Sequence, residues 1–295
     1  MDHCYSFGDR MEKMIKKAVI PAAGFGTRLL PLTKAKPKEM LSVVDKPIIQ
    51  YVIEDLADAS VDNILIVTGK GKSAIENHFD RNYGLENKLK EGGKTELLNI
   101  IGKIDNLANI FYTRQKQQKG LGDAIYCGKE FVGKEYFLAL VGDTIYTGNV
   151  VQKMLEVYEK YRCSVIVLER VPKELVYKYG VISGKEIEEG IFELDDLVEK
   201  PSVEGAPSNL IITGAYLLSP KIFDHLETIE IGAGGELQLT DAMKSLLKEE
   251  KIMGVEVDCT RYDIGDIEGW LKANVEIAME KIPNFKDYLK EVVNK

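Results

Sequence analysis

Short, continuous apolar runs alternate with stretches of helical periodicity over the first 171 residues, and this alternation restricts the possible folds most. The runs have the length of strands and cover residues 17–23, 63–69, 109–115, 136–143 and 164–171. Strands that are apolar on both sides are typical of a parallel sheet covered on both faces. Between them, residues 47–59 and 149–161 carry apolar side chains at helical spacing. The repetition predicts an α/β fold with a doubly wound, mostly parallel, Rossmann-like sheet.

The pattern changes after residue 171. Shorter apolar stretches follow, separated by Gly and Pro, at residues 179–184, 190–201 and 209–220. They predict a mixed, partly antiparallel extension of the sheet. Amphipathic stretches predict C-terminal helices, the first with Thr240 as its N-cap, and a helical insertion is expected at residues 81–102. We expect a flexible leader and then one integrated domain in two parts, with bounds at residues 1–16, 17–170 and 171–295.

The composition fits a globular protein with a local site for a small ligand. The 295 residues carry a formal net charge of −8, with 45% apolar and 29% charged residues. This acidic balance argues against nucleic-acid binding, whereas a local basic loop can still attract a small phosphorylated ligand. No apolar run approaches the ~18 residues that a spanning helix needs, so no membrane partner is expected. The four cysteines lie far apart, which fits a reducing, cytoplasmic setting better than disulfides or a zinc site.

The segment IPAAGFGTRLLPLTKAKPKEML, residues 20–41, follows the first predicted strand and has the composition of a phosphate loop. It does not match the dinucleotide fingerprint, because Leu29 stands where the third glycine should be. Pro31 and Pro37 also stand where the crossover helix would run, and a helix interior does not accept proline. The loop is therefore expected to be long and irregular, and an NAD-binding function is disfavoured.

A second candidate phosphate loop, TGKGKSAI at residues 68–75, follows the second predicted strand. Its Gly71, Lys72 and Ser73 resemble the end of a Walker A motif. The first glycine of that motif would fall at position 66, which is occupied by Ile66. We therefore expect a lysine-rich turn here and no triphosphate site.

Seven motifs along the chain carry a resemblance to a known family. They are AAGFGTRLLPLTKAKPKEML (22–41), RQKQQKGLGDA (114–124), GDT (142–144), VEKP (198–201), TGAY (213–216), GELQLTDA (235–242) and YDIGDIEGW (262–270). In this order they resemble the sugar-phosphate nucleotidylyltransferases, and the ending PKEML resembles the bacterial-type branch that acts on UTP and glucose 1-phosphate. The resemblance implies joining of the two substrates with release of pyrophosphate, Mg²⁺ as cofactor, and a homodimer or homotetramer. At GDT, Thr144 stands where the family often has a further acidic residue.

The residue types suit the roles that the resemblance implies. Glycines let the backbone approach phosphate oxygens, an arginine can clamp a leaving pyrophosphate, and a carboxylate at the end of a parallel strand lies over the ligand crevice. The expected catalytic residues are Arg28, Lys38, Asp143 and Lys200, and the expected metal ligands are Asp143 and Asp263. The expected nucleotide-binding residues are Ala22, Ala23, Gly24, Gly26, Thr27, Glu39, Gln115, Gly120 and Gly142. The expected sugar-phosphate-binding residues are Gly180, Glu199, Lys200 and Gly214.

Other interpretations stay open beside this one. The chain could be a thymidylyl- or cytidylyltransferase for another sugar 1-phosphate, or a catalytically silent nucleotide-binding regulatory subunit. Arg28, Lys38 and the two aspartates together disfavour the silent subunit, because a pure binder needs neither a leaving-group clamp nor a metal pair. A sugar phosphate is already ionised near neutral pH, so the expected reaction depends on positioning and charge neutralisation instead of a general base.

Overall fold

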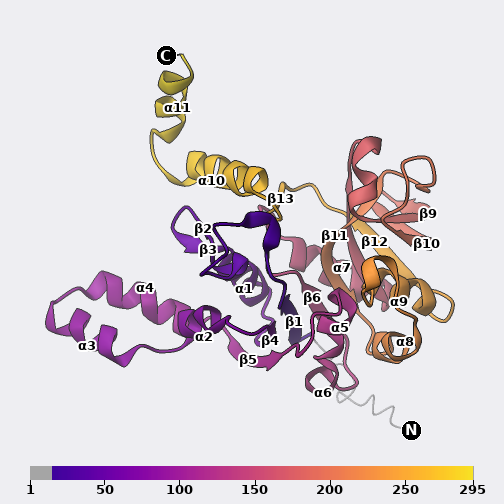
Figure 1. Cartoon of the computed structure of the whole chain (residues 1–295), viewed down its shortest axis with the longest axis horizontal. Coiled ribbons are helices and arrows are strands. Elements are labelled where there is room, and N and C mark those ends of the chain that lie inside the picture. The colour runs from indigo at the N-terminus through magenta and orange to yellow at the C-terminus, as the bar shows by residue number, and fades with distance from the viewer. Residues whose placement is uncertain (1–14, 295) are drawn as a thin grey trace, which may run out of the picture.

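The computed structural model of the chain describes residues 15–294 (Figure 1). The leader expected over residues 1–16 lies outside this range except for its last two residues. At the centre is a nine-stranded sheet with the order β5-β4-β1-β6-β11-β8-β12-β10-β9. Its strands are β1 (Lys17–Ala22), β4 (Asn63–Thr68), β5 (Asn109–Arg114), β6 (Phe137–Leu140), β8 (Ser164–Arg170), β9 (Gly180–Glu188), β10 (Ile191–Glu199), β11 (Leu210–Leu218) and β12 (Ile252–Glu256).

The five apolar runs form β1, β4, β5, β6 and β8, as predicted. Strands β5, β4, β1 and β6 are parallel neighbours, whereas β11 runs antiparallel to both β6 and β8. Strand β12 is again parallel to β8, and β10 is antiparallel to β12 and β9. The prediction of a parallel core with a mixed extension is therefore confirmed.

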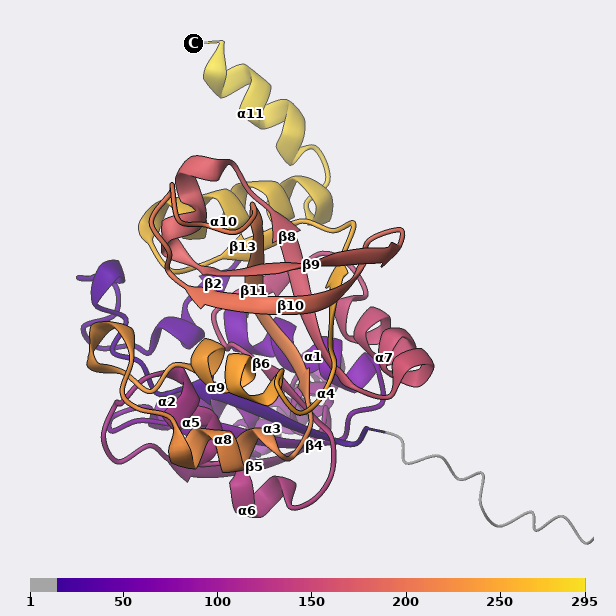
Figure 2. The same cartoon turned by 90° about the vertical axis from the view of Figure 1, so that its right-hand side faces the viewer.

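Alternating side chains of the strands form two apolar cores, one on each face of the sheet. In β1, Ala18 and Ile20 join the first core, and Val19 joins the second, as the two-residue period of a strand requires. The first core is covered by α1 (Ile48–Asp58), α2 (Ser73–Phe79) and α7 (Val150–Tyr161). The second is covered by α5 (Leu121–Tyr126), α6 (Lys129–Val132), α8 (Ile222–Thr228) and α9 (Leu239–Leu246) (Figure 2).

Two helical arms project from this body (Figure 1). One is the hairpin of α3 (Tyr83–Glu91) and α4 (Thr95–Asp105), which confirms the predicted helical insertion. The other consists of α10 (Ile267–Lys281) and α11 (Phe285–Val293) at the C-terminal end. Within residues 15–294, the structure has no helix with the length and apolar character needed to span a membrane.

Small elements shape the loops at one end of the sheet. They are the short helices η1 (Thr27–Leu29), η2 (Lys38–Met40), η3 (Lys173–Lys178) and η4 (Ala233–Gly235), the pair β2 (Ser42–Val43) and β3 (Lys46–Pro47), and the pair β7 (Thr144–Tyr146) and β13 (Arg261–Asp263). A third apolar cluster, which includes Leu29, Leu41 and Ile277, packs the long loop after β1 against α10. The loop is therefore irregular, as predicted, but it is anchored.

The prediction of Thr240 as an N-cap is wrong. Helix α9 begins one residue earlier, at Leu239, with Gln238 in the cap position. The Thr240 hydroxyl instead donates a hydrogen bond of 2.7 Å to Oε2 of Glu199 in β10. An N-cap hydroxyl would accept a hydrogen bond from a backbone N–H, whereas here the hydroxyl donates to a carboxylate, which is a strong acceptor. The side chain of Thr240 is therefore oriented by this tertiary contact.

Candidate active site

The carboxyl ends of β1 and β6 bring Lys38 and Asp143 together. The two strands are parallel neighbours, so the loop after β1 and the residues after β6 meet at one edge of the sheet. Nζ of Lys38 donates to Oδ2 of Asp143 in a short, half-buried ion pair. Burial by itself lowers the pKa of Lys38, but the carboxylates of Asp143 and Glu39 outweigh it and raise that pKa. The ammonium group therefore stays charged at the edge where the predicted nucleotide loop lies.

The β7–β13 pair brings Asp263 to the same place. Asp263 lies opposite Thr144 in the register of the two strands, and the N–H of Ile264 donates to the carbonyl of Asp143 over 3.0 Å. Oδ2 of Asp263 lies 3.4 Å from Nη1 of Arg261, which is itself paired with Glu169. One predicted metal ligand, Asp263, thus ends β13, and the other, Asp143, directly precedes β7 of the same small sheet.

Arg28 completes this cluster of charges. A Cβ at Gly265 would lie 3.0 Å from Oδ1 of Asp263 and 3.5 Å from Nη1 of Arg28. The Arg28 side chain therefore lies beside the turn that follows Asp263, and it is exposed. The predicted clamp, the loop lysine and the two carboxylates converge from separate segments of the chain.

The glycine-rich turn lies next to these charges. Gly26 has a left-handed backbone with φ of 67°, which glycine adopts at little cost, and its carbonyl accepts a 2.8 Å hydrogen bond from the Thr33 hydroxyl. A Cβ at Gly24 would lie 3.9 Å from Cε of Lys38, so the backbone and the ammonium group border the same space. Gly24 and Thr27 are exposed, whereas Ala22 and Ala23 are buried at the strand end.

Gln115 is buried directly after β5, with 6% of its surface exposed. Its amide nitrogen donates to the carbonyl of Gly120 over 3.1 Å and to Oδ2 of Asp123 over 2.7 Å. Both partners are acceptors only, so the nitrogen must face them and Oε1 remains available as an acceptor. Gly120 has φ of 103°, and a Cβ there would lie 2.7 Å from Cβ of Glu236. A side chain at position 120 would therefore disturb the turn that orients Gln115.

Three of the predicted sugar-phosphate residues, Gly180, Glu199 and Lys200, meet at the end of β10. Glu199 lies opposite Gly180 in the β9–β10 register, and a Cβ at Gly180 would lie 3.3 Å from Oε2 of Glu199. Nζ of Lys200 is 3.1 Å from Oε1 of Glu199, and 48% of the lysine side chain is exposed. Gly214, with φ of 94°, lies against Val141, and Val141 N–H donates to its carbonyl over 3.0 Å. Gly214 is thus adjacent to the segment that leads into Asp143.

Comparison with known proteins identifies the family. The sequence profile described as Nucleotidyl transferase matches residues 17–280. The chain belongs to the nucleotidyl transferase family. A protein of Methanocaldococcus jannaschii, named provisionally as a UTP–glucose-1-phosphate uridylyltransferase, is 68% identical over 280 residues, which are 95% of this chain and 99% of that protein.

Solved structures agree with this nucleotidyl transferase assignment. A crystal structure of UDP-glucose pyrophosphorylase complexed with UDP-glucose has a TM-score of 0.82 and 42% identity, and covers 91% of this chain and 100% of that one. A UTP-bound UGPase from Acinetobacter baumannii has a TM-score of 0.86 and 35% identity, and covers 95% and 99%. The predicted fold class and the predicted family are therefore both confirmed.

The structure places Glu39 away from the open side of the nucleotidyl transferase site. Its side chain is 1% exposed, and both carboxylate oxygens accept hydrogen bonds from Nζ of Lys72, at 2.9 and 2.8 Å. Gly142 lies directly behind it, because a Cβ there would be 3.3 Å from Cγ of Glu39. The predicted nucleotide contact of Glu39 can therefore come only from its backbone or through its neighbours.

Sequence analysis missed two side chains of this site. The lysine-rich turn predicted over residues 68–75 is confirmed only for residues 69–72, because Thr68 ends β4 and α2 begins at Ser73. Lys72 at the end of this turn is buried against Glu39. Gln118 is the second of these side chains. Its Nε2 donates to the carbonyl of Ala23 over 2.9 Å. The only signal for Lys72 in the sequence was its resemblance to a Walker A end, which pointed to a different function.

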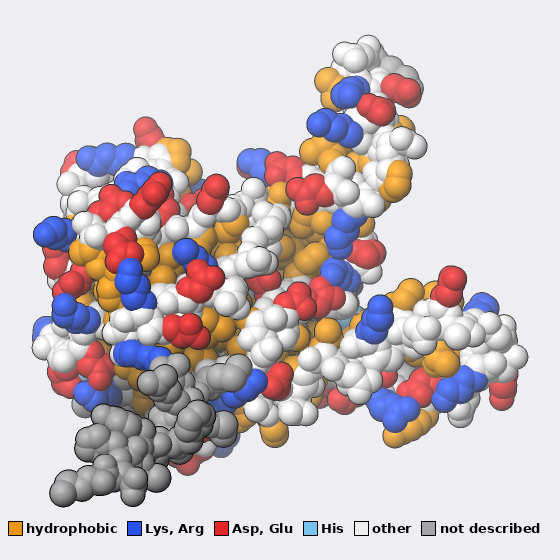
Figure 3. Space-filling view, turned by 180° about the vertical axis from the view of Figure 1, so that it is seen from behind, with side chains coloured by type: hydrophobic (Ala, Val, Ile, Leu, Met, Phe, Trp, Pro, Cys, Tyr) orange, Lys and Arg blue, Asp and Glu red, His pale blue; other side chains and the backbone are white. Residues whose placement is uncertain are grey.

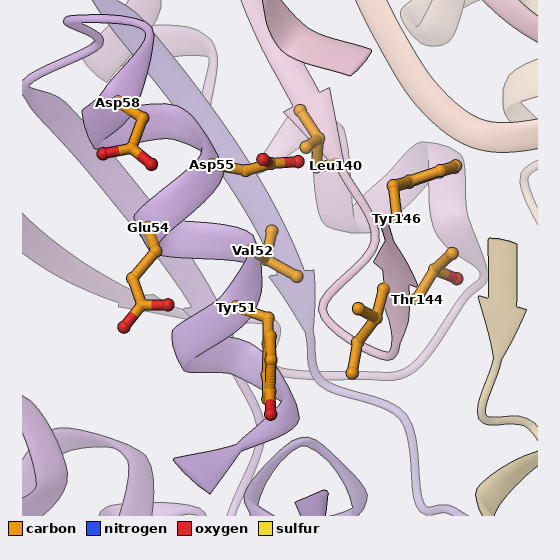
Figure 4. Close-up of a pocket in the computed structure, with 9 residues that line it drawn as sticks. Tyr51, Val52, Glu54, Asp55, Asp58, Leu140, Thr144 and Tyr146 are labelled. Atoms are coloured by element: carbon orange, nitrogen blue, oxygen red, sulfur yellow. The ribbon is translucent and has the colours of Figure 1, made fainter. Parts of the chain in front are cut away.

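A metal ion would have few protein ligands in this nucleotidyl transferase. Within residues 15–294, no three or more His, Cys, Asp or Glu side chains are grouped so that they could hold a metal. Two carboxylates fit Mg²⁺, which keeps several waters and uses substrate phosphates as further ligands. The Thr144 side chain does not extend this pair. It is buried and lines a cavity of about 90 Å³ between α1 and β6–β7, next to Tyr146 (Figure 4).

Proposed function

We propose that the chain is a UTP–glucose-1-phosphate uridylyltransferase that makes UDP-glucose and pyrophosphate from UTP and glucose 1-phosphate. The observation that carries the proposal is the convergence of Arg28, Lys38, Asp143 and Asp263 where the loop after β1 meets the residues after β6. The solved relatives that hold UDP-glucose and UTP support the choice of substrates.

The reaction needs positioned charge and no general base. An oxygen of the glucose 1-phosphate attacks the α-phosphorus of UTP, and the bond from that phosphorus to the bridging oxygen of the β-phosphate breaks. The attacking phosphate is already ionised, so no proton has to be removed. Lys38 and Arg28 neutralise charge on the triphosphate, and Arg28 holds the departing pyrophosphate. Lys200 binds the incoming phosphate from the other side.

Mg²⁺ belongs to the proposal. Members of this family are typically Mg²⁺-dependent, and Asp143 and Asp263 are the residues that would hold the ion. When bound, the ion neutralises negative charge on the phosphates. Lys38, which pairs with Asp143 in the structure, would release this carboxylate and turn to the nucleotide.

The preference for uracil rests on Gln115. Uracil has an N–H donor at N3, whereas cytosine has an acceptor there. Because the amide nitrogen of Gln115 is held by Gly120 and Asp123, its oxygen is the group left to meet N3. It accepts from uracil and faces the lone pair of cytosine, so a site of this kind discriminates strongly between the two bases.

The proposal extends to the assembly and the compartment. Exposed apolar side chains lie on both helical arms (Figure 3), among them Ile100 of α4 and Leu271 and Val293 of the C-terminal arm. Such surfaces favour a homodimer or homotetramer, which light scattering coupled to size-exclusion chromatography would measure. The cysteines among residues 15–294 are free, and a cytoplasmic enzyme is part of the proposal.

A pyrophosphate-release assay tests the function. The purified protein is supplied with Mg²⁺ and every pairing of UTP, dTTP or CTP with glucose, galactose or mannose 1-phosphate. We expect the highest kcat/KM with UTP and glucose 1-phosphate. Highest turnover with dTTP or CTP would favour the thymidylyl or cytidylyl alternative, and nucleotide binding without any pyrophosphate would favour the silent subunit.

A further inference from the structure

Lys72 and Glu39 form an almost fully buried ion pair outside the groups that meet the substrates. Their side chains are 8% and 1% exposed, and Nζ of Lys72 donates to both carboxylate oxygens. The pair joins the turn after β4 to the loop after β1. Removing one partner of a buried pair leaves an uncompensated charge, so this contact fixes the two loops relative to each other.

Glu39 connects this pair to the charged groups of the site. It follows Lys38 directly in η2, and its side chain packs behind Gly142, which precedes Asp143. The negative charge of Glu39 also acts on Lys38. A displaced Glu39 side chain would therefore move the backbone at both Lys38 and Asp143.

The β4–α2 turn supports the nucleotide loop at a second point. A Cβ at Gly69 would lie 2.8 Å from the carbonyl of Ala23 and 3.3 Å from Nε2 of Gln118. Gln118 donates to that same carbonyl. The turn thus packs closely against the strand end that precedes Gly24, which makes Lys72 one of two supports for the loop.

Lys72 also affects which carboxylate the Lys38 ammonium group pairs with. Under the proposed function, Lys38 would leave Asp143 for the phosphates when UTP binds. A Glu39 carboxylate without Lys72 would then compete for the Lys38 ammonium group, because no other cation contacts it among the ion pairs of residues 15–294. Lys72 occupies both oxygens of Glu39 and removes this competition.

We propose that Lys72 is a positioning residue for nucleotide binding, which holds Glu39 and thereby keeps Lys38 and Asp143 in the geometry that UTP requires. The inference rests on the proposed function for its kinetic readout. It differs from a direct phosphate contact, in which Lys72 would touch the nucleotide, and from a purely structural pair, which would affect folding alone.

The test compares Lys72→Met with the double variant Lys72→Met/Glu39→Gln in the full chain. The rate of pyrophosphate release is measured at varied UTP with saturating glucose 1-phosphate, and at varied glucose 1-phosphate with saturating UTP. UTP affinity is measured separately by calorimetry. We expect Lys72→Met to raise the KM for UTP about tenfold or more and the KM for glucose 1-phosphate less than twofold. Removing the unpaired carboxylate in the double variant should lower the KM for UTP again by at least threefold. Lys70→Met, at an exposed position of the same turn, should change either KM less than twofold.

Several results would overturn the inference. An unchanged KM for UTP in folded Lys72→Met would make the pair structural only, and a loss that the double variant does not recover would make Lys72 a direct phosphate ligand. If Lys72→Met does not fold, Lys72→Gln, which removes the charge but keeps a polar side chain, takes its place, and an unchanged KM for UTP in that variant counts equally against positioning. A parent protein without pyrophosphate release refutes the proposed function instead. Calorimetry with UTP then still tests the role of Lys72, because an unchanged UTP affinity in Lys72→Met would refute the positioning role.

Discussion

The proposed nucleotide end and the proposed sugar end of the site hold their cations in different ways. Lys38 is paired with Asp143 from a distant strand, and its side chain is 23% exposed. Lys200 is paired with the adjacent Glu199, and its side chain is 48% exposed. Pairing across the fold holds the loop that carries Lys38 against the residues after β6, whereas pairing with a sequence neighbour ties Lys200 to no other segment. Under the proposed function, this loop is therefore in place before UTP binds and only the Lys38 ammonium group changes its partner, whereas the sugar end is completed by its substrate.

The strongest test of this difference is Asp143→Asn. The variant removes the charge of a proposed metal ligand, which is also the partner of Lys38, while the side chain keeps its size. We expect kcat to fall about 1000-fold or more, because several kcal/mol of charge stabilisation are lost. Circular dichroism and the melting temperature should stay close to those of the parent. Turnover within tenfold of the parent at saturating Mg²⁺ would contradict the metal assignment.

Arg28→Ala tests the clamp at the nucleotide end. The exposed guanidinium acts mainly on the charge that develops on the leaving pyrophosphate, and one such contact contributes on the order of 3 kcal/mol, or about 100-fold in kcat. The KM for glucose 1-phosphate should change little. Lys34→Ala, an exposed lysine of the same loop, is the matched control. A change limited to the KM for glucose 1-phosphate would reject the clamp.

The sequence predicted the sheet and the residues at its strand ends because both follow from local patterns. Apolar runs determine which segments are buried strands, and the carboxyl end of a parallel strand determines where Asp143 must lie. The Glu39–Lys72 pair has no such pattern. It depends on the path of an irregular loop that folds back over β4, and no periodicity encodes that path.

The failure at Thr240 has a related cause. The residue has the chemistry of an N-cap, and the local sequence supported that role. The carboxylate of Glu199, 41 residues earlier in the chain, takes its hydroxyl instead. Local rules therefore predicted the elements well, whereas the polar contacts that orient the site depend on pairs that only the tertiary structure creates.

Lys200→Met tests the sugar end. It removes a charge-assisted contact to the incoming phosphate, for which about 1.5–3 kcal/mol is typical, so the KM for glucose 1-phosphate should rise about 10–100-fold. UTP affinity should change less than twofold, because Lys200 takes no part in the Lys38–Asp143 contact. Calorimetric titration of each ligand separates the two effects, with Lys178→Met at an exposed position as control. Equal losses for both ligands would show that the two ends are not independent.

Gln115→Ala tests whether preorganisation at the nucleotide end extends to the base. Without the held carboxamide oxygen, the UTP-over-CTP ratio of kcat/KM should fall about tenfold, within the 1–3 kcal/mol typical of one lost discriminating contact. The exposed Gln117 provides the matched control as Gln117→Ala. A variant that keeps the parental ratio would mean that other groups recognise the base.

The smallest expected effect on turnover comes from Asp55→Asn. This variant tests whether the partly buried carboxyl group of Asp55, close to the proposed site, affects catalysis. Asp55 points from α1 toward Leu140 in the cavity that Thr144 lines (Figure 4). Burial, together with the charges of Asp58 and Glu54, raises its pKa from 3.8 to about 7. The folded protein therefore holds an extra proton between about pH 4 and pH 7, and stability is lost as the pH rises through that window. The full difference corresponds to at most about 4 kcal/mol, and solvent screening of the partly exposed carboxyl reduces it. We expect the neutral variant to be more stable than the parent by about 1 kcal/mol at pH 8 and no more stable at pH 4, in urea unfolding at both pH values.

The kcat and both KM values of Asp55→Asn should match those of the parent. A kcat reduced tenfold would show that the cavity is coupled to Asp143 through β7. A variant as stable as the parent at both pH 4 and pH 8 would mean that the pKa of Asp55 is not raised.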